Sequence, residues 1–536
     1  MRQLNRALLL LSGAGLTFLA FILATPSVGF AATPADTIVM AKQIDDMITI
    51  DPAEAYEFSA LEIDANLYDR IMTYDPATSK VVPGVIASSE ASKDGSSLTL
   101  KVRPGQKFTS GNPLTADDIA FSLQRVVKLD KSPAFILTQF GWTKDNVEEM
   151  VVAKDPETVS LTIPAKLAPS FVLNCLSAGV GSVLDKKEVL SRQKDGDLGY
   201  EWLKSHAAGS GAFSLRSWKP NEVILLDANP NYAGGSPKVK RVAIRHVPEP
   251  ATQRLLLEKG DVDIARNMSP DQIEGLKSNA KIKVESFPKA DTWYVALNQK
   301  DERLSKPGVR QALRWLIDYQ NIADSITKGR FKVHQAFLPE GFPGALNDSP
   351  YKLDVEKAKK LLADAGYPDG FELQLDVSNS YPSTNVAQAI QATMGQAGIK
   401  ISIVPGEQRQ VITKYRARQH QAVLLYWSPD YMDPHSNAGS FAWNPDNSDN
   451  ASDKPLAWRN AWDIPDLTKR TEEALKETDE TARMAMYAEL QKSLLDDGPF
   501  LIAFQNVDQV AMRKEVGGFV DGALSDHVLY KNLTKN

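Results

Sequence analysis

The chain has 536 residues but only one cysteine, Cys175. A single cysteine cannot form an intramolecular disulfide, which excludes the small secreted scaffolds that disulfides hold together. A chain of this length is also too long for one hydrophobic core, so we expect two or three domains, each stabilised by its own core. Cys175 stands in the largely apolar stretch Phe-Val-Leu-Asn-Cys-Leu, which predicts a buried small side chain rather than a nucleophile.

Runs of basic residues are missing as well. The chain has 61 lysines and arginines against 67 acidic residues, which gives a formal net charge of -6. No stretch is rich in lysine or arginine, and this argues against a nucleic-acid partner.

Metal-binding and catalytic motifs are also lacking. The six histidines show no metal-ligand spacing. The sequence contains no nucleophile elbow, no paired zinc-binding histidines, no phosphate loop and no dinucleotide-binding glycine pattern. It therefore predicts a protein that is not an enzyme and that uses neither a metal nor a cofactor.

Only one apolar run, residues 7–24, approaches the length that spans a bilayer. Arg2 and Arg6 precede this run and small residues follow it, which is the arrangement of a cleavable secretory signal peptide. We expect the signal peptide at residues 1–31, with cleavage after Ala31. A retained membrane anchor is the alternative, but the glycines and the proline of this region weaken it. Because the region has no cysteine for a lipid anchor, we expect a freely soluble protein of the periplasm.

Periodicity in the remaining chain indicates an α/β protein. Apolar residues from Val309 to Ile317 follow the i, i+3, i+4, i+7, i+8 pattern of a helix, whereas Leu98, Leu100 and Val102 alternate as in a half-buried strand. Strands separated by helices predict crossover units in an α/β sheet. The expected strands include 371–375, 401–403, 422–426 and 500–504, and the expected helices include 355–365, 387–394 and 481–495.

Seven segments, in this order, resemble the dipeptide/oligopeptide-binding (peptide/nickel-type) family of solute-binding proteins that serve ABC importers. One is the turn-and-strand stretch 209–232, which ends in Asn-Pro-Asn-Tyr, and another is Trp-Ser-Pro-Asp-Tyr-Met-Asp-Pro at 427–434. Each segment alone is weak, but together they cover nearly the whole chain after the signal region. The other five are 98–123, with Pro-Leu-Thr-Ala-Asp-Asp inside it, 254–264, 294–298, 309–318 and 351–371.

The resemblance implies a two-lobed α/β periplasmic binding protein of the large peptide-receptor type, with an extra inserted domain. It also implies a monomer that captures a peptide or peptide-like solute by closure of the lobes. The solute then passes to the permease subunits of an ABC importer and their ATPases. The implied boundaries are 33–76, 206–288 and 505–536 for the discontinuous first lobe, 77–205 for the inserted domain and 289–504 for the second lobe.

The resemblance implies that Asp430 pairs with the α-ammonium group of the ligand. A carboxylate facing a cation forms a short, charge-assisted hydrogen bond. The alternative is a turn aspartate, since Pro429 stands beside it, and Asp433 is expected to be a turn former.

The same resemblance marks further candidate ligand contacts. A loop after a strand would place three residues beside the ligand, and aromatic residues would form the opposite walls. The alternatives are an exposed loop and buried core aromatics. The candidates are Tyr56, Glu57 and Phe58 in the loop, Trp293, Tyr294 and Trp427 as walls, and Trp142 from the inserted domain.

One departure from the family bears on the ligand. Short-peptide receptors of this family commonly hold the ligand carboxylate with an arginine in the loop that corresponds to residues 376–385, and none occurs there. Hydroxyl groups do not replace the bidentate bonds of an arginine. Arg459 could compensate from another loop. A longer or modified peptide, an opine-like conjugate, an oligosaccharide or a metal chelate therefore becomes an alternative ligand.

Two further hypotheses come from other functional classes. A secreted α/β hydrolase could bring two of the many carboxylates together in a cleft, although no local motif supports it. A periplasmic holdase or adhesion module could use a large cleft for unfolded chains.

Overall fold

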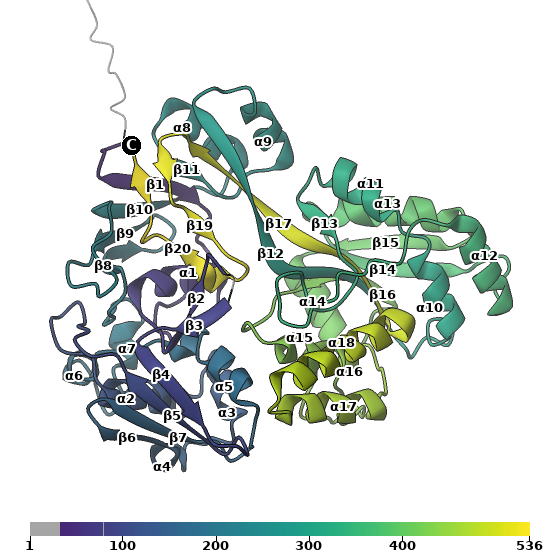
Figure 1. Ribbon diagram of the computed structural model, residues 1–536. Coiled ribbons are helices and arrows are strands. Elements are labelled where there is room, and N and C mark those ends of the chain that lie inside the picture. The colour runs from purple at the N-terminus through teal and green to yellow at the C-terminus, as the bar shows by residue number, and fades with distance from the viewer. Residues whose placement is uncertain (1–32, 79) are drawn as a thin grey trace, which may run out of the picture.

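The computed structural model describes residues 33–78 and 80–536, so the expected signal peptide lies outside the described residues. The protein has two lobes, and the long strands β12 (Ile282–Leu297) and β17 (Phe500–Arg513) run between them (Figure 1). The structure therefore confirms an α/β fold with two lobes. Within the described part of the chain, no helix has both the length and the apolar character that crossing a membrane requires.

One mixed sheet of 11 strands extends through both lobes, in the order β15-β14-β16-β12-β17-β11-β1-β10-β9-β8, and β13 pairs with β17. Its first-lobe strands are β1 (Thr37–Lys42), β8 (Phe213–Lys219), β9 (Val223–Ala228), β10 (Arg241–His246) and β11 (Ile264–Ala265). Its second-lobe strands are β13 (Phe331–Val333), β14 (Glu372–Ser378), β15 (Lys400–Gly406) and β16 (Ala422–Trp427).

The β12 and β17 pair is antiparallel along nearly its whole length, but its register shifts between Pro288 and Thr292. The residues before the shift lie with the first lobe, and the residues after it pair beside β16 in the second lobe. A register shift bends a strand and increases its twist. The crossing between the lobes is therefore irregular at residues 289–291.

The second lobe follows the expected crossover pattern. The pairs β14–β15 and β14–β16 are parallel, and helices connect them. The expected strands correspond to β14, β15, β16 and the start of β17, and the expected helices correspond to α12, α13 and α18, so these predictions are confirmed. One helix is shorter than predicted: α10 ends at Arg314, because the chain tightens into turns whose N–H groups bond three residues back. The helices of this lobe are α10 (Pro307–Arg314), α11 (Tyr319–Asn321), α12 (Val355–Asp364), α13 (Ser383–Gly395), α14 (Gln408–Arg416), α15 (Pro434–Phe441), α16 (Leu456–Arg459), α17 (Pro465–Lys476) and α18 (Glu480–Asp497).

A separate four-stranded antiparallel sheet, in the order β4-β5-β7-β6, lies between residues 86 and 162. Helix α2 (Ala116–Leu129) packs on it and begins with a capping box, in which the backbone N–H and the hydroxyl of Thr115 both donate to the Asp118 carboxylate at 2.9 Å. Asp118 therefore stabilises the start of this helix. The strands are β4 (Ile86–Ala91), β5 (Ser97–Val102), β6 (Val151–Asp155) and β7 (Thr158–Thr162), and the short hairpin β2 (Met72–Asp75) and β3 (Lys80–Pro83) precedes them.

Cys175 ends α5 (Pro169–Cys175) and is fully buried in the core beside this smaller sheet. Burial raises the pKa of its thiol well above the usual range, so the thiol is unreactive at neutral pH, as expected. The remaining helices are α1 (Phe58–Leu67), α3 (Phe135–Thr138), α4 (Val147–Met150), α6 (Lys186–Ser191), α7 (Tyr200–Leu203), α8 (Pro250–Lys259) and α9 (Pro270–Leu276).

Candidate ligand-binding site

A cavity of about 770 Å³ lies between the two lobes. Its wall combines the loop before α1, the loop after β16 and the irregular crossing of β12 and β17. This volume lies within the range of small-molecule sites. A smaller cavity of about 200 Å³ lies apart, around Asp69, Arg70 and Tyr232 of the first lobe.

Asp430 and Tyr56 meet across this cavity. The Tyr56 hydroxyl donates a hydrogen bond to the Asp430 carboxylate, and the backbone N–H of Asp430 donates to the Ser436 hydroxyl at 2.9 Å. Burial raises the pKa of Asp430 to about 6, although the Tyr56 bond opposes this effect. Among residues 33–78 and 80–536, no cation forms an ion pair with Asp430. A ligand ammonium group would therefore find a carboxylate with only neutral donors around it.

The two residues after Tyr56 differ in their position. Phe58, the first residue of α1, lines the cavity and is 47% exposed. Glu57 does not line the cavity; its carboxylate accepts the Tyr56 backbone N–H at 3.3 Å, and burial raises its pKa. Glu57 therefore supports the loop, while its neighbours present their rings to the cavity.

The aromatic wall of the second lobe comes from Trp427 and Tyr426, both of which line the cavity. The Trp427 indole N–H donates to the Asn437 side chain at 3.0 Å. Trp293 and Tyr294 do not line it, because β12 is a central strand that is covered on both faces. Trp293 stacks on Tyr426, with 5.1 Å between ring centroids, and Tyr294 is 1% exposed in the core of the opposite face.

Trp142 and Arg459 also lie outside the cavity wall. Trp142 is 1% exposed, and its indole N–H donates to the Thr162 carbonyl at 2.7 Å, so it belongs to the core beside the smaller sheet. Arg459 lies in α16, donates to the Lys454 carbonyl at 3.1 Å and stacks over Tyr415. Arg459 therefore does not supply the missing cation.

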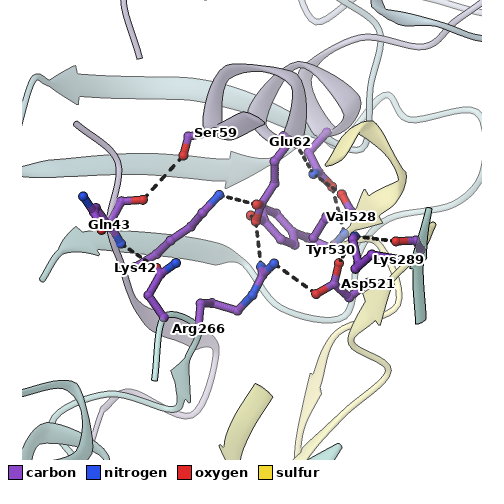
Figure 2. A network of polar contacts seen from close by, with 12 residues as sticks. Lys42, Gln43, Ser59, Glu62, Arg266, Lys289, Asp521, Val528 and Tyr530 are labelled. Atoms are coloured by element: carbon purple, nitrogen blue, oxygen red, sulfur yellow. Dashed lines mark hydrogen bonds and ion pairs between the residues drawn. The ribbon is translucent and has the colours of Figure 1, made fainter. Parts of the chain in front are cut away.

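Basic side chains that the sequence did not reveal line the cavity instead. Three of them, Lys42, Arg266 and Lys289, belong to a buried network (Figure 2). Arg266 bonds Glu62 at 2.9 Å and Asp521 at 3.1 Å, Lys289 bonds Asp521 at 2.8 Å, and Lys42 bonds Glu62. Burial opposes ionisation of Glu62, but Arg266 and Lys42 lower its pKa to about 2. Each of these three cations therefore already has a carboxylate partner within the protein.

Two carboxylates at the crossing of the lobes were also missed. Asp291 of β12 accepts the Ser428 hydroxyl, and burial raises its pKa to about 6. Asp508 of β17 accepts the Asn506 amide at 3.0 Å. Both carboxylates line the cavity and have polar but uncharged hydrogen-bond donors. No short motif contains them, because they come together only when β12 and β17 pair.

A second contact of the second lobe lies beside this cavity, where the loop after β16 meets α5. Tyr431 is 4% exposed and packs against Phe171, with 5.7 Å between ring centroids. Asp433 caps α15, forms a buried ion pair with Arg483 at 2.6 Å and accepts the Asn174 amide at 3.0 Å. The turn role expected for Asp433 is thus observed, and it also joins the second lobe to α5.

Among residues 33–78 and 80–536, no group of three or more His, Cys, Asp or Glu side chains is placed to hold a metal ion.

Three kinds of similarity accompany this geometry. Residues 80–449 match the model of the family described as bacterial extracellular solute-binding proteins, family 5 Middle. The probable D,D-dipeptide-binding periplasmic protein DdpA of Escherichia coli (strain K12) is 29% identical over 525 residues, which are 96% of this chain and 98% of that protein. The dipeptide-binding protein of the same organism is 26% identical over 86% of this chain and 88% of its own length. The solved structure of the periplasmic binding protein DppA from Helicobacter pylori, in complex with peptide STSA, has a TM-score of 0.75 and 22% identity, and covers 93% of this chain and 98% of that chain.

Proposed function

We propose, since the chain belongs to family 5 of the bacterial extracellular solute-binding proteins, that it captures a peptide or peptide-like solute between its lobes and delivers it to the permease of an ABC importer. The observation that carries this proposal is the cavity between the lobes, with Asp430 in its wall. The names of its relatives support a peptide ligand.

The proposed mechanism is closure of the lobes without covalent chemistry. The ligand ammonium group bonds Asp430 of the second lobe, while Tyr56 and Phe58 contact the ligand from the first lobe. Contacts from both lobes favour the closed state, because a ligand shifts an equilibrium only by its difference in affinity for the two states. The irregular stretch of β12 at residues 289–291, where its pairing with β17 shifts register, is the proposed hinge.

The cellular setting is part of the same proposal. The signal peptide, residues 1–31, directs the chain to the periplasm, where the mature protein works as a monomer with the permease subunits and their ATPases. We keep the domain boundaries expected from the sequence and change one of them. The boundary between residues 76 and 77 cuts the β2–β3 hairpin, so we place the start of the inserted domain after Pro83.

The experiment that tests this function combines two measurements on the purified mature chain. Mass spectrometry identifies any solute that co-purifies, and tryptophan fluorescence follows titration with peptide, opine and amino-sugar libraries. Saturable binding of peptides supports the proposal. No fluorescence change with any member of the peptide library refutes a peptide ligand. Turnover of a bound ligand supports the hydrolase hypothesis. Suppression of client aggregation without saturable binding supports a holdase.

A further inference from the structure

We infer that Arg330 binds the carboxylate at the far end of the ligand and that the ligand is an extended peptide of three or four residues. This inference rests on the proposed function and deepens it. Arg330 lies outside residues 376–385, where the resemblance leads one to expect the carboxylate-binding arginine, and it belongs to a different segment of the second lobe.

Arg330 is the cation of the cavity wall that the protein leaves uncompensated. The other lysines and arginines of that wall are Lys42, Arg266 and Lys289, and each has a carboxylate partner. The Arg330 guanidinium has no hydrogen-bond or ion-pair partner in the part of the chain that the structure describes. A planar guanidinium with free N–H groups is suited to bidentate capture of a carboxylate.

The two lysines on either side of Arg330 differ from it, because each has an ion-pair partner. Lys328 pairs with Asp271 at 2.6 Å, and Lys332 pairs with Glu340. Neither lysine lines the cavity. The segment therefore offers three cations, of which only the one that faces the cavity is available to a ligand.

The backbone holds Arg330 in place at the edge of the sheet. Its N–H donates to the Thr327 carbonyl at 3.1 Å, and its carbonyl accepts the Val507 N–H at 2.7 Å. Gly329 precedes it with a φ of 81°, a conformation that glycine adopts without strain, so the chain turns here before β13 begins. Tyr381, 39% exposed, also lines the cavity. Tyr381 and Arg330 thus belong to the same cavity wall, and burial raises the pKa of Tyr381 while the charge of Arg330 partly offsets this effect.

The sheet gives the distance between the two ends of the proposed site. The strands lie in the order β13, β17, β12, β16, with Arg330 beside the first and Asp430 after the last. Neighbouring strands are about 4.8 Å apart, so three steps separate the two ends by about 14 Å. An extended chain rises about 3.3 Å per residue, so a ligand of about three or four residues covers this span and a dipeptide covers about half of it.

The charges between the two ends favour a ligand with one terminal negative charge. Asp291 and Asp508 line the middle of the span and would repel a second anionic group. Their oxygens, with those of Asn506, can accept the backbone N–H groups of an extended peptide. A peptide with an ammonium group at Asp430 and a carboxylate at Arg330 fits this order of charges.

The experiment compares randomised tetrapeptides as free acids with the same mixture as C-terminal amides. Each protein is stripped of solute in denaturant and refolded, and mass spectrometry measures the peptides that it retains. We expect the wild type to retain free acids roughly tenfold to a hundredfold better than amides, the effect of a charge-assisted hydrogen bond converted to affinity. Randomised dipeptides should be retained less well than tetrapeptides.

The variants locate this preference. Arg330→Gln should bind amides like the wild type but lose the preference for free acids, and Arg330→Lys should show an intermediate preference. Lys332→Gln, the ion-paired neighbour outside the cavity wall, should behave as the wild type. A preference for free acids that survives in Arg330→Gln, or equal retention of both mixtures by the wild type, overturns this assignment alone. Failure of the wild type to retain either mixture overturns the proposed peptide function, and this assignment with it.

Discussion

Replacing Asp430 by asparagine should make the protein bind amines more weakly and fold more stably at the same time. Burial raises the pKa of Asp430 to about 6, and its one side-chain donor is the neutral Tyr56 hydroxyl. The difference from the ordinary value near 3.9 corresponds to about 3 kcal/mol of penalty on the charged form. Because Asp430 is only half-buried, we expect Asp430→Asn to gain about 1–2 kcal/mol of unfolding free energy at pH 7.5.

The same substitution removes the partner of the ligand ammonium group. A hydrogen bond to a charged group contributes about 1.5–3 kcal/mol, so the dissociation constant of an amine-bearing peptide should rise roughly tenfold to more than a hundredfold. Calorimetric titration measures the affinity, and urea unfolding of the unliganded protein measures the stability.

The pH dependence follows from the same group. The unliganded carboxylate takes up a proton as pH falls through about 6, whereas an ammonium partner holds its pKa lower in the complex. Affinity should therefore be constant above pH 7 and fall below pH 6. As the pH falls through the same range, the free energy of unfolding of the wild type should rise relative to that of Asp430→Asn, because protonation removes the penalty on the charged carboxylate.

Asp291 is the necessary control, because burial raises its pKa to about 6 as well. Asp430→Asn should remove most of the fall in affinity between pH 7 and 5, and Asp291→Asn should keep most of it, because the ligand ammonium group pairs with Asp430. An affinity that Asp430→Asn leaves unchanged, or a pH profile that only Asp291→Asn flattens, would refute the assignment of the ammonium site to Asp430.

Three further substitutions test other parts of the structure. Arg483→Met leaves the buried Asp433 without its ion-pair partner and should lower the free energy of unfolding in urea by about 3–5 kcal/mol. The control Arg470→Met removes a surface ion pair and should lower it by less than about 1 kcal/mol. Equal losses in the two variants would contradict a stabilising role of the buried ion pair. Phe58→Ala should weaken peptide binding roughly tenfold, measured by titration, and change the free energy of unfolding by no more than about 0.5 kcal/mol because the ring is exposed; unchanged affinity would remove Phe58 from the site. Trp142→Phe should cost about 1–3 kcal/mol through its lost bond to a buried carbonyl and leave peptide affinity unchanged, and a loss of affinity would return Trp142 to the cavity wall.

Local patterns in the sequence predicted the elements of the second lobe well. Strand β16 is a continuous apolar run because helices cover both faces of the sheet, and α18 begins with an aspartate cap at Asp479. Apolar runs and helix caps depend on neighbouring residues only, so they can be recognised in the sequence without knowledge of the rest of the fold. The end of α10 was missed because the apolar pattern continues through the tighter turn that follows Arg314.

The candidate site was harder to predict, because its wall depends on pairings between distant residues. Adjacent residues of a strand commonly point to opposite faces, and Trp293 and Tyr294 accordingly pack in the two different cores beside β12. Lys289 lines the cavity but is neutralised by Asp521, 232 residues away. No local spacing reveals that this lysine is paired, while the side chain of Arg330 has no partner among residues 33–78 and 80–536. The resemblance, rather than periodicity, pointed to the loop residues Tyr56 and Asp430, which the structure places in the cavity wall.

The contact of Tyr431 with α5 has a consequence for the release of cargo. The Tyr431 ring is buried in the apolar core that contains α5, so separating the second lobe from α5 exposes the ring to water. Hydrating an aromatic side chain costs about 1.5–3 kcal/mol, and this cost is independent of what the cleft carries. Under the proposed function, the importer must therefore supply this free energy each time it opens the protein, and the same cost disfavours opening of the empty protein.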